Sequence, residues 1–196
     1  PRTLFSNDPA VVGAFVDDVR AGGGQVVTKM QSSFAVMREG LEHVVFTSVV
    51  DDAARADLDG LRFCPMQFQE RIDKKLELRA TVVGGDVFCA AVDSAAHSEE
   101  TQVDWRKDGV GLLAKWTPYA LPSSTSTALV ELVRSFGLHY AAADFIVTAD
   151  DDLVFLEINA GGEWFWLDEH VAGAPRLPIA DAIAGWLASS ASSADT

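Results

Sequence analysis

The sequence has little of several residue types, and each shortage narrows the class of protein. Only Cys64 and Cys89 among its 196 residues are cysteine, and they form no CxxC pair, while no histidine stands at a metal-ligand spacing. A zinc site is therefore not indicated. We expect both cysteines to be buried, reduced thiols; a disulfide between them is the alternative.

Basic residues are also scarce, with 15 Lys and Arg against 29 Asp and Glu, which gives a formal net charge of −14. Nucleic acid is therefore not an expected partner, because phosphate backbones bind positive surfaces. A small anionic substrate stays compatible if metal ions and a few local cations offset the negative field. The chain has neither an apolar run long enough to span a membrane nor a signal peptide, so no membrane partner and a cytoplasmic location are expected.

What is present suits a packed globular fold, since 48% of the residues are hydrophobic and 22% charged. Capping residues and helical spacing predict helices over residues 9–21, 51–61, 123–136 and 178–189. Alternating or β-branched runs predict strands over residues 25–30, 34–37, 44–49, 66–72, 76–83, 87–94, 138–148 and 153–159.

The order of these elements indicates an α+β fold in two lobes. We expect a smaller lobe over residues 1–69 and a larger lobe over residues 70–188. Residues 38–43 are interpreted as a hairpin turn, residues 95–121 as a long polar loop that is often functional, and residues 189–196 as a disordered tail.

Two acidic strands carry the sharpest chemical pattern. If Thr148 pairs with Leu153 across the turn, the antiparallel register places Asp144 directly opposite Glu157, and Asn159 falls on the same face. Two carboxylates and an amide oxygen at one place favour a hard divalent cation such as Mg²⁺ or Mn²⁺. The alternative is that these residues line the solvent-facing side of a sheet.

A nucleotide site also needs cations. Lys29 interrupts an apolar strand and is either a phosphate ligand or an edge-strand lysine that resists aggregation. Glu77 and Arg79 project together from the non-core face of their strand, where a plain ion pair between them is the alternative. Arg106 lies in the long loop and is either functional or a surface residue. The acidic residues 150–152 are interpreted as a solvated turn.

Taken in order, these segments resemble the ATP-grasp superfamily from about Thr3 to Leu187. The resemblance rests on a strand lysine, a hinge, an acidic and basic strand, an arginine loop and the acidic strand pair, in residues 26–29, 68–72, 77–84, 104–106 and 144–159. Residues 3–9, 104–106 and 162–164 are similar to the ligases that make ester and amide crosslinks in microviridin-like ribosomal peptides. The ligases that add glutamate to a ribosomal protein are also similar.

The resemblance implies an ATP-grasp fold that binds nucleotide and Mg²⁺ between the antiparallel sheets of its two lobes. It implies phosphate contacts for Lys29, an adenine contact for the backbone of Glu70 and Arg71 with Ile72 against the base, and a ribose contact for Glu77. The implied catalytic residues, which steady the transferred phosphate and the acyl-phosphate, are Arg79 and Arg106. The implied ligands of Mg²⁺ or Mn²⁺ are Asp144, Glu157 and Asn159.

The implied activity is an ATP-dependent ligase that joins a carboxylate to an amine or alcohol through an acyl-phosphate, acting on a ribosomally made peptide. The alternatives are a ligase that adds amino acids such as glutamate to a protein terminus, and a nucleotide-binding module without catalysis. These enzymes carry a further N-terminal domain, so the chain is expected to be the ATP-grasp portion of a longer ligase. A homodimer stays open.

Overall fold

A computed structural model describes residues 1–30, 35–44, 46–94, 96, 103–108, 110–170 and 177–193. The chain divides into two compact units. Unit 1 comprises Pro1–Asp73 and Glu99–Lys107, and unit 2 comprises Lys74–Ser98 and Asp108–Thr196. The first division thus falls four residues beyond the expected boundary, and residues 99–107, which we expected in the larger lobe, group with unit 1.

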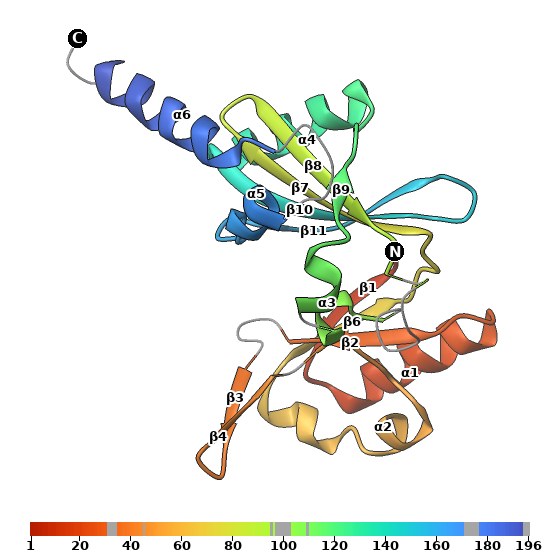
Figure 1. Ribbon diagram of the computed structural model, residues 1–196. Coiled ribbons are helices and arrows are strands. Elements are labelled where there is room, and N and C mark those ends of the chain that lie inside the picture. The colour runs from red at the N-terminus through yellow and green to blue at the C-terminus, as the bar shows by residue number, and fades with distance from the viewer. Residues whose placement is uncertain are drawn as a thin grey trace. The chain divides into compact units, whose positions relative to one another are not determined.

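Unit 1 is built on a four-stranded antiparallel sheet with the strand order β1-β6-β2-β5 (Figure 1). These strands are β1 (Thr3–Ser6), β2 (Val26–Lys29), β5 (Ser48–Val49) and β6 (Met66–Glu70). Helix α1 (Pro9–Ala21) contacts β1 and β2 and buries a valine stripe against the sheet. The core of unit 1 consists of Val12, Val16, Val19, Val26, Val50, Leu61 and Phe68.

The start of α1 follows from its sequence. Asp8 caps the helix, since its carboxylate accepts from the backbone N–H of Ala10 at 2.8 Å and of Val11 at 3.4 Å. Pro9 occupies the first turn, where its missing N–H costs no hydrogen bond. The capping motif therefore predicts this helix correctly, whereas the sequence pattern did not predict the short edge strand β1.

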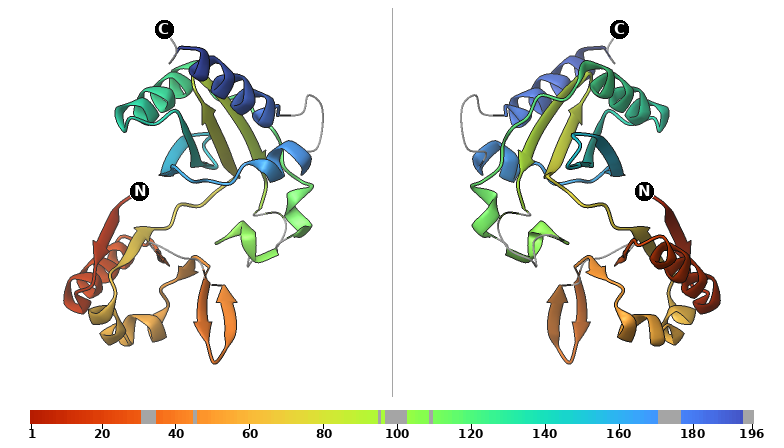
Figure 2. Two further views of the ribbon diagram at one scale, coloured as in Figure 1. Left: turned by 90° about the vertical axis from the view of Figure 1, so that its left-hand side faces the viewer. Right: turned by 90° about the vertical axis from the view of Figure 1, so that its right-hand side faces the viewer.

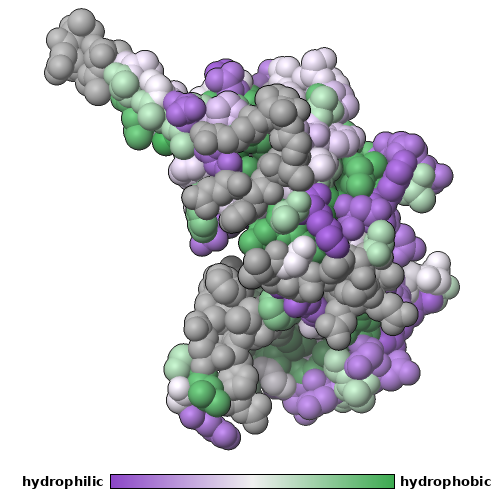
Figure 3. All heavy atoms as spheres, in the orientation of Figure 1, coloured by the Kyte–Doolittle hydropathy of each residue, from purple (hydrophilic) through white to green (hydrophobic). Residues whose placement is uncertain are grey.

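The remainder of unit 1 corrects two expectations. The hairpin is tighter than expected, with β3 (Ala35–Arg38) and β4 (Leu41–Val44) joined at Glu39 and Gly40, both at positive φ. Two positive φ values fit the turns whose twist matches paired strands. The expected helix over 51–61 is instead the short helix α2 (Asp52–Ala56) and the 3-10 turn η1 (Asp59–Phe63). Figure 3 shows hydrophilic beside hydrophobic residues at this hairpin, which exposes Met37 and Leu41.

Unit 2 contains a five-stranded antiparallel sheet with the order β11-β10-β7-β8-β9. Its strands are β7 (Leu76–Val83), β8 (Asp86–Val92), β9 (Thr117–Pro118), β10 (Tyr140–Val147) and β11 (Leu153–Asn159). Helix α4 (Ser123–Ser135) packs on one face of the sheet through Leu129, Val130 and Val133 (Figure 2). The two antiparallel sheets with their helices confirm the α+β class.

The expected long loop contains regular structure. It holds the 3-10 turn η2 (Trp105–Asp108), helix α3 (Val110–Leu113) and strand β9, while residues 97–102 lie outside the described residues. A short helix α5 (Phe165–His170) follows β11 and buries Trp166 in an edge-to-face contact with Trp116, with ring centroids 5.1 Å apart. Edge-to-face contact is a favoured geometry for two aromatic rings, and each ring here buries a large apolar area.

The C-terminal helix is longer than expected. Helix α6 (Ile179–Ser193) contacts α5 and β7 and continues through most of the segment that we expected to be disordered; residues 194–196 lie outside the described residues. Alanine and serine in this tail permit a helix, which composition alone did not indicate. No helix in the described part of the chain combines the length and apolarity that a membrane crossing requires.

The cysteines differ from each other. Both are free thiols, as expected, but only Cys89 is buried, whereas Cys64 is exposed in unit 1. Burial raises the pKa of the Cys89 thiol to about 12. The expectation of two buried thiols is thus wrong for Cys64, because the turn that follows η1 carries it to the surface.

Candidate functional site

A row of charged residues crosses the sheet of unit 2. Asp144 in β10 lies opposite Glu157 of β11 on one side and opposite Arg79 of β7 on the other. Asn159 lies opposite Ala142, two residues along each strand, and therefore shares the face of Glu157 and Asp144. The structure brings together four of the residues singled out in the sequence.

The pairing of Asp144 with Glu157 is confirmed, although the turn that leads to it differs from the expectation. Val147, rather than Thr148, pairs with Leu153, so the hairpin starts one residue out of the expected register. A β-bulge between Asp144 and Phe145 then restores it. Bulges of this kind redirect side chains and are common beside functional sites.

Arg79 and Asp144 form an ion pair in which Nη1 of Arg79 lies 3.0 Å from Oδ1 and 3.1 Å from Oδ2 of Asp144. The side chain of Arg79 is 16% exposed and that of Asp144 is 33% exposed. Among the described residues Arg79 thus pairs with Asp144 and Glu77 pairs with Lys74, rather than with each other as a plain ion pair would require. The guanidinium offsets the repulsion expected between Asp144 and Glu157.

A tight turn holds the end of β11. The side-chain oxygen of Asn159 accepts from the backbone N–H of Gly161 at 2.9 Å, and the hydroxyl of Tyr140 donates to the carbonyl of Gly162. Gly162 has no room for a side chain, since an added Cβ would lie 2.4 Å from the Cβ of Ala142. The turn therefore packs closely against the sheet face that carries Ala142 and Asp144, and the hydrogen bond from Gly161 N–H holds the Asn159 side chain.

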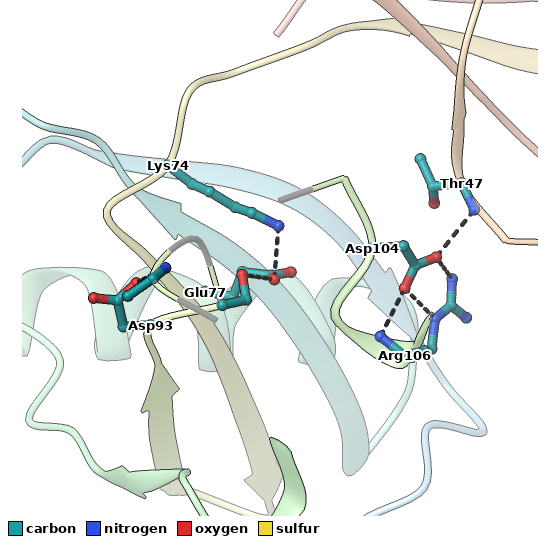
Figure 4. A network of polar contacts seen from close by, with 8 residues as sticks. Thr47, Lys74, Glu77, Asp93, Asp104 and Arg106 are labelled. Carbon is teal, nitrogen blue, oxygen red and sulfur yellow. Dashed lines mark hydrogen bonds and ion pairs between the residues drawn. The ribbon is translucent and has the colours of Figure 1, made fainter. Parts of the chain in front are cut away.

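Glu77, for which the ATP-grasp resemblance implies a ribose contact, lies in a compact polar network of unit 2 (Figure 4). Its Oε1 atom accepts from Lys74 Nζ at 2.7 Å and from Ser94 Oγ at 2.5 Å. The side chains of Lys74 and Glu77 are 6% and 16% exposed. Glu77 and Arg79 project from the same face of β7, as the alternation of that strand predicted.

In unit 1, Lys29 ends β2 and lies opposite Gln67 of β6. Strand β5 pairs only with Val27 and Thr28, so the sheet order places β2 inside the sheet but leaves the backbone of Lys29 beyond the reach of β5. Lys29 is half-buried on the face that it shares with Val27, opposite the face through which Val26 joins the core. Lys29 therefore does not lie on a long edge strand, where a lysine would resist aggregation.

The backbone hydrogen bonds of the hinge segment, residues 68–72, restrict how a nucleotide base could bind there. The backbone N–H of Glu70 donates to the carbonyl of Arg2 at 2.9 Å, and that of Arg71 donates to Gln25 at 2.8 Å. The Arg71 guanidinium also donates to the Gln25 side chain at 2.6 Å. Both backbone donors are thus committed to the sheet. Among the described residues no hydrogen bond involves the N–H of Ile72, so this group and the carbonyls are what the hinge can offer.

Arg106 is exposed, and its guanidinium binds the buried carboxylate of Asp104. Its Nε and Nη2 atoms donate to the two oxygens of Asp104 at 2.8 and 2.6 Å, and the backbone N–H of Thr47 donates to Asp104 at 3.0 Å (Figure 4). Burial alone would raise the pKa of Asp104, but the hydrogen bonds and charge of Arg106, with the Thr47 amide, outweigh it and lower this pKa.

Sequence reasoning did not assign roles to Lys74, Ser94, Asp104 and Tyr140. Each is a polar partner of a residue that it did single out, or of the turn beside one. Asp104 belongs to the Asp-Trp-Arg triplet that carried part of the resemblance, and this triplet was the available signal. Lys74 and Ser94 gave none, because they lie in separate segments, before β7 and after β8, that come together at Glu77 only in the fold.

The oxygen atoms on the acidic face fit a hard divalent cation. No group of three His, Cys, Asp or Glu side chains in the described part of the chain is arranged to hold a metal ion. Asp144, Glu157 and Asn159 instead supply two carboxylates and one amide oxygen at neighbouring register positions. Such a set suits Mg²⁺ that keeps open positions for phosphate oxygens.

Comparison with known proteins finds solved structures that are similar to this chain. No family model and no curated protein matches the chain. The structure of a RiPP-associated ATP-grasp ligase of Chryseobacterium gregarium, in complex with ADP and a leader and core peptide, is 43% identical with a TM-score of 0.86. It matches 97% of this chain and 55% of its own. The macrocyclase MdnC of Microcystis aeruginosa, bound with precursor peptide MdnA, is 43% identical over 97% of this chain and 54% of its own, with a TM-score of 0.78.

The ATP-grasp ligase PsnB, complexed with a precursor variant, Mg and ADP, shares the fold at 20% identity and a TM-score of 0.68 over 95% of this chain and 53% of its own. The fold is therefore that of the ATP-grasp superfamily. Within it, the chain belongs to the ATP-grasp ligases of ribosomal-peptide maturation. It spans about half the length of these relatives.

Proposed function

We propose that this chain is the ATP-grasp portion of a ligase that crosslinks or modifies a ribosomally made peptide. The observation that carries the proposal is the row of Arg79, Asp144 and Glu157, with Asn159 on the same face. It supplies a cation and hard oxygen ligands at one place. The likeness to the peptide-bound relatives supports the peptide as substrate.

In the proposed reaction, a carboxylate oxygen of the peptide attacks the γ-phosphorus of ATP, the bond to the β-phosphate oxygen breaks and ADP leaves. An amine or hydroxyl then attacks the acyl carbon, and phosphate leaves as the nucleophile loses its proton. The product is an amide or an ester. Most of the rate in phosphoryl transfer comes from positioning and from neutralising charge.

The residues have separate roles in this proposal. Asp144, Glu157 and Asn159 would hold Mg²⁺, which when bound neutralises phosphate charge. Arg79 lies beside them and would contact the transferred phosphate. Lys29 would contact the nucleotide phosphates.

At the hinge, the carbonyl of Glu70 or Arg71 would accept a hydrogen bond from the adenine amino group. The backbone N–H of Ile72 would donate a hydrogen bond to the base, and the Ile72 side chain would pack against it. Arg106, whose Nε and Nη2 donate to Asp104, would contact the acyl-phosphate. Its charge is largely neutralised there, so this role is orientation more than charge attraction.

The test is calorimetric titration of the chain with a non-hydrolysable ATP analogue, with and without Mg²⁺, and with the GTP analogue as control. We expect adenine-selective binding that depends on Mg²⁺. Glu157→Ala combined with Asn159→Ala should abolish the Mg²⁺ dependence and leave the fold intact, because both side chains are exposed. The matched control is Asp150→Ala, an exposed carboxylate in the neighbouring turn.

Two results would contradict the proposal. Absence of binding at millimolar nucleotide, with the chain folded, would show that it does not form a nucleotide site. Binding without transfer to a peptide in a protein of the relatives' full length would instead favour a module without catalysis.

A further inference from the structure

Two donors reach the Glu77 carboxylate, and both bind the same oxygen. Lys74 Nζ and Ser94 Oγ donate to Oε1, at 2.7 Å and 2.5 Å, whereas within the described residues Oε2 accepts no hydrogen bond. The network is nearly enclosed, since Lys74 and Glu77 side chains are 6% and 16% exposed and Ser94 is 1% exposed. One carboxylate oxygen is therefore anchored and the other is left as an acceptor.

The sheet register explains why these three residues meet. Glu77 lies opposite Val92 of β8, so Ser94, two residues beyond Val92, continues on the same face. Lys74 lies three residues before Glu77, just ahead of the strand. The backbone N–H of the following residue, Lys75, donates to the carbonyl of Val147 at 2.7 Å, which anchors this segment to β10.

Such anchoring matters because the terminal torsion of a glutamate is soft. A carboxylate rotates over a broad two-fold profile, so its lone pairs have no fixed direction unless neighbours hold them. Here an ammonium and a hydroxyl hold Oε1 from two separate segments of the chain, and the ammonium also offsets the cost of removing the carboxylate from water. Oε2 is consequently a directed and charged acceptor.

We infer that Lys74 and Ser94 are positioning residues that aim Glu77 Oε2 at the ribose hydroxyls of the nucleotide, and that this network makes the chain select ribonucleotides over deoxyribonucleotides. The inference rests on the proposed function and on the ribose contact that the ATP-grasp resemblance implies for Glu77. A hydroxyl that donates to a charged, partly buried acceptor contributes strongly, and a ligand that lacks it leaves the acceptor unsatisfied. Selectivity therefore depends on how firmly the acceptor is aimed.

The experiment measures the dissociation constants of ADP, 2′-dADP and 3′-dADP with Mg²⁺ for the 196-residue chain by calorimetry. We expect at least one deoxynucleotide to bind about tenfold more weakly than ADP. Lys74→Met and Ser94→Ala should each reduce this ratio about threefold or more, and Lys74→Arg should restore most of it. Lys75→Met, which removes a neighbouring lysine that is half exposed and paired with Asp151, should leave the ratio unchanged.

Each outcome supports or overturns the inference. A purely structural role for Lys74 and Ser94 would change the melting temperature and weaken all three nucleotides equally, which would overturn it. Equal affinity of the unaltered chain for ADP and both deoxynucleotides would overturn it too and leave the proposed function intact. If the unaltered chain binds none of them, the proposed function and the inference fail together. Ser94→Ala keeps the test valid if Lys74→Met does not fold.

Discussion

Nη1 of Arg79 lies within hydrogen-bonding distance of both carboxylate oxygens of Asp144, at 3.0 and 3.1 Å. The guanidinium thus occupies the side of Asp144 that faces β7, while Glu157 lies on the side that faces β11. Asp144, a proposed metal ligand, is therefore held by Arg79, the residue that is proposed to contact the transferred phosphate. The order and charge of this row make its response to divalent cations predictable.

Replacing Arg79 with methionine should make the stability of the chain depend on Mg²⁺. The change removes the guanidinium that offsets the repulsion between Asp144 and Glu157, so the free energy of unfolding should fall by about 1 kcal/mol without divalent cations. Millimolar Mg²⁺ should restore part of it. Thermal melts with and without Mg²⁺ measure the effect. Arg55→Met, which breaks the remote pair with Asp17, is the control and should show no Mg²⁺ response.

Asp104→Asn should destabilise unit 1 by about 1–3 kcal/mol, because the amide cannot accept at both oxygens and no longer carries the negative charge that Arg106 binds. The lowered pKa of Asp104 means that its stabilising contribution is complete above the unfolded value of about 3.9 and is lost as pH falls through the lower folded value. Denaturant unfolding at pH 7 and below pH 4 should therefore show a difference between the two proteins that shrinks in acid. A constant difference would mean that Asp104 is not ionised in the fold.

Gly162→Ala should cost about 1–3 kcal/mol of stability, because the new Cβ would lie 2.4 Å from the Cβ of Ala142 and neither atom can rotate away from its backbone. The displaced turn should also weaken Mg²⁺-dependent nucleotide binding through Asn159. The double variant with Ala142→Gly removes the clash and should recover much of both losses. Equal defects in the single and double variants would show that contact with Ala142 is not the cause.

The two thiols should react at very different rates. Exposed Cys64 should react with a chromogenic disulfide reagent at pH 8, whereas Cys89 is buried and its pKa is raised to about 12, so almost no thiolate forms. One thiol per chain should titrate quickly in the folded protein and two in denaturant. Cys64→Ser should abolish the fast phase, and persistence of that phase would place Cys89 at the surface.

Local sequence is enough to set the pattern within each strand. Side chains alternate with a period of two, so Glu157 and Asn159 had to share a face, as did Glu77 and Arg79, whatever lay beside them. The cap at Asp8 and the α+β class followed equally from local chemistry. The likeness of the ordered segments to ATP-grasp ligases was also evident from the residues and their order alone.

Which charges meet, in contrast, depends on the tertiary arrangement. Arg79 and Asp144 are 65 residues apart in sequence, and their pairing requires β7 to lie next to β10, which no local pattern encodes. The same holds for Ser94 against Glu77 and for Thr47 against Asp104. The bulge that returns Asp144 to Glu157 arises in the same way, because register is settled by burying one face of the whole sheet rather than by the turn alone.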